Sequence, residues 1–191
     1  MPDTGVEWVT RWEGDLAHEE HDALSAMISL TFERIDPGSS AHFRDGRSWA
    51  GERPEIRLYA RNQKGVRAHI SVKRRFVRVS GRDQLVGDIG MVAVHPEAQR
   101  TGLGTETLRK LDDLLHVLSV PFGLVDCRHE IVNFYASNGW SLLPDSEIRC
   151  ADNADPRTTL TVAGPVLIRP VTEHLKEWPS GKIIERNGFE V

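Results

Sequence analysis

The sequence predicts a mixed α/β fold in a single domain, residues 1–191. Strand-like runs bounded by turn residues fill much of the first half of the chain. Further on, apolar residues spaced three and four apart follow the period of a helix, at Leu108, Leu111, Leu115 and Leu118. Strands then alternate with helices. The expected order is an antiparallel meander followed by strand–helix–strand–helix–strand, with about seven strands in all.

The composition is that of an ordinary globular protein and narrows the possible functions. Hydrophobic residues make up 39% and charged residues 27%, and the formal net charge is −4. This balance argues against nucleic-acid binding, for which a basic excess is typical. No apolar run approaches the roughly 20 residues that span a bilayer, and the polar start of the chain has no secretory pattern. Cys127 and Cys150 are too few for a disulfide framework and lack zinc-ligand spacing, so we expect a cytoplasmic monomer or homodimer that needs no metal.

In the first half, the apolar pattern predicts one helix and four strands. Residues 15–32 have apolar side chains at helical spacing, whereas 36–51 is rich in Gly, Ser, Arg and Asp and is expected to form an ordered loop or a short broken helix. The strands are expected at 7–12, 56–61, 67–79 and 85–94. The last of these is apolar on both faces after Asp88, which is typical of a central strand.

In the second half, helices and strands alternate. The leucine stripe predicts a helix over 103–119, and a shorter helix around 131–135 is ended by Asn138-Gly139. Strands are expected at 121–125, 140–143 and 158–168. The tail from Pro170 is polar and is expected to contain a turn at 178–181.

One segment carries a specific chemical signal: Val-His-Pro-Glu-Ala-Gln-Arg-Thr-Gly-Leu-Gly-Thr at 94–105. It follows a strand and begins a helix, where free backbone N–H groups and the positive end of the helix dipole favour a phosphate. Gly102 and Gly104 let a diphosphate approach the backbone, and Arg100 can add a charge-assisted hydrogen bond. A dinucleotide fold would need a glycine where Thr107 stands, and a P-loop would need Gly-Lys-Ser/Thr. The alternative is a tight turn that only begins a helix.

Two motifs resemble signatures of the GNAT superfamily of N-acetyltransferases. Gln-x-x-Gly-x-Gly at 99–104 resembles its acetyl-CoA loop, and Asn-Phe-Tyr-Ala-Ser-Asn-Gly-Trp at 133–140 resembles its second signature. The resemblance implies a twisted mixed sheet, mostly antiparallel, flanked by helices and splayed in the middle for an acyl donor. The donor would be acetyl-CoA or a longer acyl-CoA. The positions that the resemblance assigns to the donor are Val92, Val94, Gln99, Arg100, Thr101, Gly102, Gly104, Thr105 and Asn133.

The same resemblance implies two catalytic side chains. Tyr135 stands where the superfamily has a tyrosine that protonates the departing thiolate, and a phenol with a pKa near 10 suits that task. Asp88 stands where many members have a glutamate that accepts the proton of the attacking ammonium. The alternatives are that Tyr135 is a half-buried helix aromatic and that Asp88 pairs with an arginine. The amine is expected to attack the thioester directly, because neither cysteine lies in a nucleophile motif.

Further segments resemble the nodulation-factor N-acyltransferase (NodA) family over nearly the whole chain. These segments are Arg-Ser-Trp-Ala-Gly-Glu-Arg-Pro-Glu at 47–55, Ala68-His69, Arg74-Arg75-Phe76, Arg128-His129, Glu-Trp-Pro-Ser-Gly at 177–181 and Arg-Asn-Gly at 186–188. That family acylates the free amine of a deacetylated chitin oligosaccharide with a fatty acyl group from acyl carrier protein. The resemblance implies an acceptor-side half at 1–84, an acyl-donor core at 85–140, and C-terminal strands with a tail at 141–191. The intact donor loop and Asn-x-Tyr helix favour CoA and short acyl groups over the carrier protein.

A second resemblance, to the aminoglycoside 2'-N-acetyltransferases, leaves the acceptor open. It rests on Ala68-His69, Arg74-Arg75, Tyr-Ala-Ser at 135–137 and Gly139-Trp140. Both families acylate an amine on a sugar, so an amino sugar is the expected small-molecule partner. Such acceptors need carboxylates and flat aromatic faces, for which the candidates are Trp49, Glu52, Glu177 and Trp178. The alternative for Trp178 is a packing anchor for the tail.

Two other hypotheses of function stay open, and several polar residues are expected to be structural. The chain could be a non-catalytic module that binds CoA or a carrier protein, or a protein acetyltransferase. Arg74 and Arg75 alternate on a strand, so at most one of them can face a cleft, and we expect both to be solvated. His69 and His129 are expected to be hydrogen-bonded structural histidines, since no further metal ligands lie at useful spacing.

Overall fold

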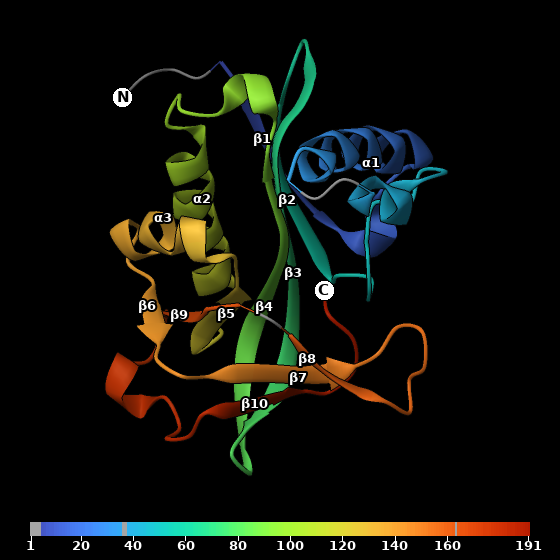
Figure 1. Ribbon diagram of the computed structural model, residues 1–191. Coiled ribbons are helices and arrows are strands. Elements are labelled where there is room, and N and C mark those ends of the chain that lie inside the picture. Colours follow the sequence, from blue (N-terminus) through green and yellow to red (C-terminus); the bar gives the residue numbers. More distant parts are fainter. Residues whose placement is uncertain (1–4, 36–37, 163) are drawn as a thin grey trace. The chain divides into compact units, whose positions relative to one another are not determined.

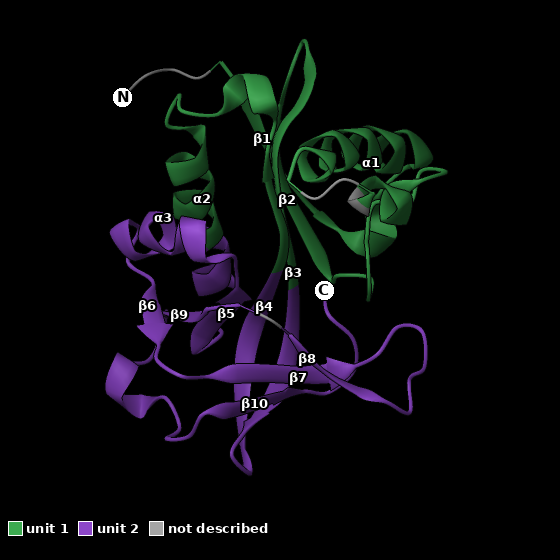
Figure 2. Cartoon of the chain, in the orientation of Figure 1, with its two compact units in different colours: residues 1–72, 90–111, 191 green, residues 73–89, 112–190 purple. Residues whose placement is uncertain are grey.

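The computed structural model describes residues 5–35, 38–162 and 164–191. Its contacts group the chain into two compact units (Figure 2), one from residues 1–72, 90–111 and 191 and the other from 73–89 and 112–190. These units do not coincide with the three segments expected from the sequence. Two long strands, β3 (Gly65–Val79) and β4 (Arg82–Val94), contribute to both units.

The first unit is built on antiparallel strands. β1 (Glu7–Trp12) pairs with β2 (Ile56–Asn62), and β2 pairs in turn with the first part of β3 through a short turn in which Lys64 N donates to Asn62 Oδ1. The helix α1 (His18–Glu33) follows a short 3₁₀ turn at Glu13–Asp15. The helix α2 (Leu103–Val117) contributes its residues up to Leu111.

Alternation along these strands divides the apolar side chains of the first unit between two faces. Val9 and Tyr59 belong to a buried cluster with Leu24, Met27 and Ile28 of α1, whereas Ala60 and Leu103 belong to another cluster with Trp8 beside it. Because neighbouring strand residues point to opposite faces, α1 and the start of α2 cover opposite faces of the sheet of this unit. Figure 1 shows the two helices on either side of β2.

The second unit has a mixed sheet. The last part of β4 within this unit pairs in parallel with β5 (Phe122–Asp126), through Val86–Asp88 against Phe122–Leu124. β5 continues antiparallel to β9 (Val166–Pro170), and β9 to β6 (Ser141–Leu143). On the other side, β10 (Ile183–Arg186) joins the end of β3 to β7 (Glu147–Ala151), which pairs with β8 (Thr159–Val162).

A short helix, α3 (Val132–Ser137), lies next to β6 in the second unit. Two residues after its last residue lies Gly139, whose φ of +84° suits glycine just past a helix C-terminus. Arg169 of β9 donates to the Gly139 carbonyl at 2.8 Å and also binds the carboxylate of Asp112, with its Nη2 2.5 Å from Oδ2. A methyl group on Gly139 would lie 2.2 Å from Arg169 Nη1, so this arginine fixes the end of α3.

The predicted fold class is confirmed, and several boundaries are correct. β1 has the expected bounds, α2 begins at the expected residue, and β4 has strand neighbours on both sides as a central strand should. α1 begins three residues later than expected because Glu13–Asp15 forms the 3₁₀ turn. None of the helices in the described part of the chain is long and apolar enough to span a membrane.

The strand count and one strand prediction were wrong. The described residues form ten strands rather than about seven. The single strand expected at 158–168 is two strands, β8 and β9, with Gly164 at φ +140° and Pro165 between them. β7 and β10 were missed because charged residues interrupt their short apolar runs, and Arg186 of β10 is buried through ion pairs that a hydropathy pattern does not reveal.

Candidate active site

The predicted donor loop lies in the first unit, between the end of β4 and the start of α2. Arg100 has φ +62° and Gly102 has φ +90°, so the backbone takes left-handed turns at both positions before the helix begins at Leu103. Open space surrounds the position where Gly102 would have a side chain. The first N–H groups of a 15-residue helix are therefore next to a loop that leaves room for a ligand.

Side chains of the loop hold this conformation. Gln99 Nε2 donates to the Val94 carbonyl at 3.1 Å, and Thr101 Oγ1 donates to the Ala98 carbonyl at 2.8 Å. Trp8 Nε1 donates to Glu106 Oε1 at 3.1 Å and ties the first turn of α2 to β1. Gln99 and Thr101 thus shape the loop, and a direct contact of either with a donor stays a prediction.

Arg100, Gly102 and Thr105 are exposed, and Val92, Val94 and Gly104 are half-buried, so these predicted donor positions are accessible. The group that they would receive is a diphosphate, and exposed backbone N–H groups with a nearby guanidinium fit such an anion. Immediately before them, Met91 has φ +45°, which is unusual for a residue other than glycine. A conformation of this kind costs about 1–3 kcal/mol and is found most often at functional sites.

Tyr135 lies in the second unit, in the middle of α3. Its ring is 2% exposed and stands edge-on to Phe134 and Trp140, with ring centroids 5.5 Å away in each case. Burial raises the pKa of the Tyr135 phenol above its ordinary value, and the neighbouring Cys127 and Asp126 raise it further. The phenol is therefore protonated at neutral pH, as a proton donor must be. The side chain is more buried than the half-buried aromatic considered as the alternative.

Asn133, in the same helix, is exposed and lines a hollow of about 500 Å³ together with His129, Val132, Leu142 and Leu143. His129 is thus at the surface of the second unit, in the 3₁₀ turn that precedes α3. The contact of Asn133 with a donor is an untested prediction.

Asp88 is fully buried in the second unit and is held by two arginines. Its Oδ1 accepts a hydrogen bond from Arg186 Nη2 at 2.9 Å, and its Oδ2 is 3.2 Å from Arg75 Nε. Arg186 Nη2 also donates to Asp126 Oδ1 at 2.6 Å. Burial raises the pKa of Asp88, while the two arginines act in the opposite direction. Asp88 therefore has the arginine pairing that the sequence left open, and its role as proton acceptor stays a prediction.

The two adjacent arginines on β3 point to opposite faces, as the alternation predicts. Arg75 is 8% exposed and belongs to the Asp88 cluster, whereas Arg74 is exposed. The expectation that both arginines are solvated was wrong, because Arg75 forms a buried ion pair with Asp88.

The acceptor candidates of the first unit gather around Trp49. The Arg53 guanidinium lies 4.7 Å and that of Arg47 5.5 Å from the centroid of the Trp49 ring, and His21 meets the ring edge-on at 5.9 Å. Trp49 is half-buried against the α1 cluster, and Glu52 is half-buried a few residues along the same segment. This part of the first unit is a polar, aromatic surface with two positive charges.

The other two acceptor candidates lie in the second unit. Trp178 packs edge-on against Phe122, with 5.1 Å between ring centroids, beside the main apolar cluster of this unit. The packing anchor considered as the alternative is thus what the structure supports for Trp178. Glu177 is exposed and pairs with Lys176. A contact of either residue with an acceptor stays a prediction.

Comparison with known proteins identifies the family. The family model described as Nodulation protein A (NodA) matches residues 3–191. The chain belongs to the Nodulation protein A family. Nodulation protein A of Rhizobium meliloti (strain 1021) is 37% identical over 193 residues, which cover 97% of this chain and 98% of that protein. Nodulation protein A of Rhizobium leguminosarum bv. trifolii is 34% identical, with 98% of each chain covered.

Solved structures show which fold this NodA-family chain has. A GNAT family N-acetyltransferase (YhbS) from Escherichia coli, solved in complex with CoA, has a TM-score of 0.64 at 15% identity and covers 100% of this chain and 98% of its own. A GNAT family acetyltransferase from Brucella melitensis in complex with acetyl-CoA has a TM-score of 0.53 at 15% identity, with 71% and 83% covered. The fold is thus that of the GNAT acetyltransferases. Family and fold together make the chain an acyltransferase.

The sequence interpretation of this NodA-family chain predicted a hydrogen-bonded structural role for His69, which contacts Arg57 and the Met91 carbonyl, but it missed the burial of Arg57 and Arg186. Arg57 and His69 in the first unit are fully buried, and Arg186 in the second is 5% exposed. The family resemblance already marked His69 and Arg186, but only as parts of longer segments. Arg57 had no signal, because an arginine inside an apolar strand run becomes interpretable only when its partner Glu13 is known.

Proposed function

We propose that the chain is an N-acyltransferase that moves an acyl group from acyl-CoA to the free amine of an amino sugar. The observation that carries this proposal is the donor loop, where Arg100 and Gly102 turn the backbone at the start of α2. A phosphate-binding loop at this place supports a CoA donor, and membership of the NodA family supports the amino-sugar acceptor. We propose a cytoplasmic location, where CoA thioesters are available.

The donor part of the proposal draws on the solved relatives and on the chain itself. The Escherichia coli and Brucella melitensis proteins were solved with CoA and acetyl-CoA. In this chain, exposed Arg100 and Thr105 flank the N–H groups of α2, and half-buried Val92 and Val94 lie on the strand that leads to them. The phosphopantetheine of an acyl carrier protein has one phosphate where CoA has three, so it would use fewer of these contacts.

The acceptor part draws on the surface around Trp49. Arg47 and Arg53 place two positive charges at this ring, and a polycationic aminoglycoside would be repelled by them. An oligosaccharide with a single free amine meets less repulsion and offers hydroxyl and carbonyl oxygens to the guanidinium donors. The NodA-type acceptor is therefore favoured over the aminoglycoside-type acceptor, which is the second candidate function.

The proposed reaction is direct attack of the amine on the thioester carbon, with loss of the thiolate. Tyr135 gives its phenolic proton to the departing sulfur, which balances the charge of the leaving group. The attacking ammonium first loses one proton to solvent, and after the attack the nitrogen loses a second proton, which replaces the one that Tyr135 gave to the sulfur. For Asp88 the geometry favours an ion-pair role over that of proton acceptor, because both carboxylate oxygens face guanidinium groups.

A pH profile of the Asp88→Asn variant distinguishes the two competing roles of Asp88, proton acceptor and ion-pair partner. A proton acceptor would make the loss of rate largest at low pH, where the amine is most protonated. An ion-pair partner would give a loss of similar size at every pH, and this is the result that we expect. A pH-dependent loss would return Asp88 to the role of base.

The function itself is tested by thiol release from a series of acyl-CoA thioesters, acetyl to palmitoyl, against glucosamine oligomers and a panel of aminoglycosides. Turnover on glucosamine oligomers supports the proposal, and the preferred acyl length defines the donor. The same acyl groups presented on acyl carrier protein separate the two donor types. Turnover on aminoglycosides alone would make the second candidate correct, and CoA binding without turnover on any acceptor would favour a non-catalytic module.

A further inference from the structure

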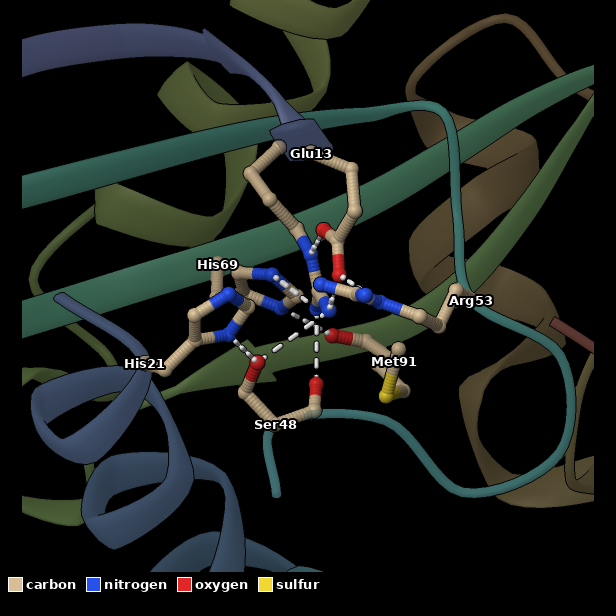
Figure 3. Close-up of polar contacts among 7 residues, drawn as sticks. Glu13, His21, Ser48, Arg53, His69 and Met91 are labelled. Carbon is tan, nitrogen blue, oxygen red and sulfur yellow. Dashed lines mark hydrogen bonds and ion pairs between the residues drawn. The ribbon is translucent and has the colours of Figure 1, made fainter. Parts of the chain in front are cut away.

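A continuous chain of polar contacts in the first unit links Glu13 through Arg57 and His69 to the main chain of Met91, and Figure 3 shows Glu13, His69 and Met91 around it. Arg57 Nε donates to Glu13 Oε2 at 2.7 Å, and Arg57 Nη1 is 3.2 Å from His69 Nε2. His69 Nδ1 is 2.9 Å from the Met91 carbonyl oxygen. Arg57 and His69 are fully buried, so these contacts are not shared with solvent.

The partners of His69 determine its tautomer. A guanidinium can only donate, so His69 Nε2 accepts from Arg57, and the ring hydrogen must be on Nδ1, where it is donated to the Met91 carbonyl. Burial lowers the pKa of His69 to about 3, and the charge of Arg57 acts in the same direction. His69 is therefore a neutral imidazole with one fixed donor and one fixed acceptor throughout the physiological pH range.

One end of this chain is the strand proposed to contact the donor. Met91 has φ +45° within β4, and Val92 and Val94 follow it at once. Its carbonyl is held by His69, and its side chain is buried in the α1 cluster. His69 holds the Met91 carbonyl and the α1 cluster holds the Met91 side chain. Together they fix the backbone of β4 at Met91, and with it the direction of the residues that follow.

The other end is the segment that carries Trp49. Arg57 Nη1 donates to the Ser48 carbonyl at 2.7 Å, and Nη2 donates to Ser48 Oγ at 3.2 Å. The hydroxyl of the fully buried Ser48 is also 2.9 Å from His21 Nδ1. One guanidinium nitrogen, Nη1, therefore contacts both His69 and the residue before Trp49. The carboxylate of Glu13 balances the charge of Arg57 and accepts from Arg53 as well, at 3.0 Å.

We propose that His69 is a positioning residue that couples the Ser48–Trp49 segment to the donor strand at Met91. An acceptor that binds at Trp49 shifts Ser48, and Arg57 and His69 carry this shift to the Met91 carbonyl, so the affinities for acceptor and donor are linked. The inference rests on the proposed function, because it takes the donor to lie along Val92–Val94 and the acceptor at Trp49. His69 itself touches neither.

Two substitutions separate the two hydrogen bonds of His69. In His69→Asn, the amide nitrogen can take the place of Nδ1 and keep the bond to Met91, but nothing accepts from Arg57. In His69→Gln, the amide oxygen can take the place of Nε2 and keep the bond to Arg57, but the Met91 carbonyl loses its donor. Both variants remove one buried hydrogen bond, so each is the stability control of the other.

The test measures the dissociation constant of CoA by titration calorimetry, first alone and then with a saturating glucosamine oligomer. CoA and the oligomer cannot react, because CoA has no acyl group. The ratio of the two dissociation constants is the coupling ratio. For the wild type we expect the oligomer to change the CoA affinity at least about five-fold, the lower end of typical coupling between sites. Both variants should bring this ratio to near one. His69→Gln should also weaken CoA binding without the oligomer, whereas His69→Asn should not.

A second readout follows Met91 directly. The chain has three methionines, so the Met91 methyl signal can be assigned in a spectrum of ¹³C-methyl-labelled protein with the aid of Met91→Leu. The glucosamine oligomer should shift this signal in the wild type and leave it unchanged in His69→Asn. If the His69 variants fail to fold, Ser48→Ala, which removes only the hydroxyl between Arg57 and His21, should lower the coupling ratio while CoA binds alone as in the wild type.

The outcomes separate this inference from the proposed function. The role of His69 would be overturned if the wild type bound both ligands with a coupling ratio of one. It would also be overturned if the variants kept the wild-type coupling ratio and lost only stability. Either result would leave the proposed function standing. A wild type that binds neither CoA nor the oligomer would overturn both.

Discussion

Arg186 donates from Nη2 to the fully buried carboxylate of Asp88, 98 positions away in the chain, at 2.9 Å. The same nitrogen reaches Asp126 at 2.6 Å, so one guanidinium is shared by two carboxylates in the second unit. Arg75 adds a second cation on the other oxygen of Asp88. Besides its backbone pairs with β3 and β7, β10 is therefore tied through this arginine to Asp88 of β4 and Asp126 of β5.

Replacing Arg186 by alanine should destabilise the protein strongly. Removing one partner of a buried ion pair leaves an uncompensated charge, which typically costs about 3–5 kcal/mol. The free energy of unfolding in urea is the measurement. Arg149→Ala is the matched control on the neighbouring strand β7, because Arg149 and its partner Glu147 are 40% and 39% exposed. That pair should contribute less than about 1 kcal/mol, and equal losses in the two variants would contradict the assigned role of Arg186.

The stability of the wild type should fall as the pH drops from about 6.5 toward 5. The pKa of His69 is lowered to about 3 in the folded protein, so below pH 6.5 the unfolded chain binds a proton that the folded protein does not. Stability therefore decreases by up to roughly 1.4 kcal/mol per pH unit for this one group. Urea unfolding at pH 7.5, 6.5, 5.5 and 5.0 measures the slope.

His69→Asn should have a shallower slope, because asparagine does not titrate. Some slope should persist, since burial also lowers the pKa of His21 and His95. The carboxylates with lowered pKa, such as Glu13, lose their contribution only below their unfolded value near 4.5, outside this window. An identical slope in the wild type and the variant would show that His69 is protonated as easily in the folded protein as in the unfolded chain.

Tyr135→Phe should lower kcat by at least about 100-fold, the lower end of what general acid catalysis contributes. CoA affinity should change little, because the hydroxyl is needed only when the thiolate departs. The other tyrosine of the chain is the control. Tyr59 donates a short hydrogen bond to Glu20 in the first unit, so Tyr59→Phe should lower stability and leave kcat within a few-fold of the wild type. A kcat near that of the wild type in Tyr135→Phe would remove Tyr135 from the reaction.

Gly102→Ala should weaken CoA binding while the protein stays folded. A side chain at φ +90° is strained by roughly 1 kcal/mol, although open space surrounds the new methyl group, so the loop rather than the core must adapt. We expect a loss of CoA affinity of about ten-fold, which corresponds to 1.4 kcal/mol. Gly14→Ala, also with open space but without positive φ, should bind CoA as the wild type does. Equal CoA affinity in both variants would place the diphosphate elsewhere.

The sequence predicted correctly the helices and strands whose apolar pattern is visible within the segment itself. β1, β2 and the start of α2 are of this kind, because apolar alternation or helical spacing is visible within each segment. The donor loop was predicted from its glycines and its place before a helix. The backbone does turn at Arg100 and Gly102, and α2 begins at Leu103, whereas the binding of a donor at this loop stays a prediction.

The buried polar groups could not be predicted, because their partners are far away in the chain. Arg57 is 44 positions from Glu13, and Arg186 is 60 positions from Asp126. From the sequence alone, each of these arginines would be predicted to lie at the surface, because only the strand pairing shows the carboxylate beside it. The same reason explains why β10 was taken for part of a polar tail.

The contacts of Arg169 limit how relatives of this protein can change over evolution. One guanidinium holds both oxygens of Asp112 and the carbonyl of Gly139, and it fills the space that a side chain at 139 would need. A lysine has a single nitrogen and could not replace these bonds. Substitutions at 112, 139 and 169 should therefore occur together among homologous sequences, and a relative that changes only one of the three should show a compensating change nearby at the end of α3.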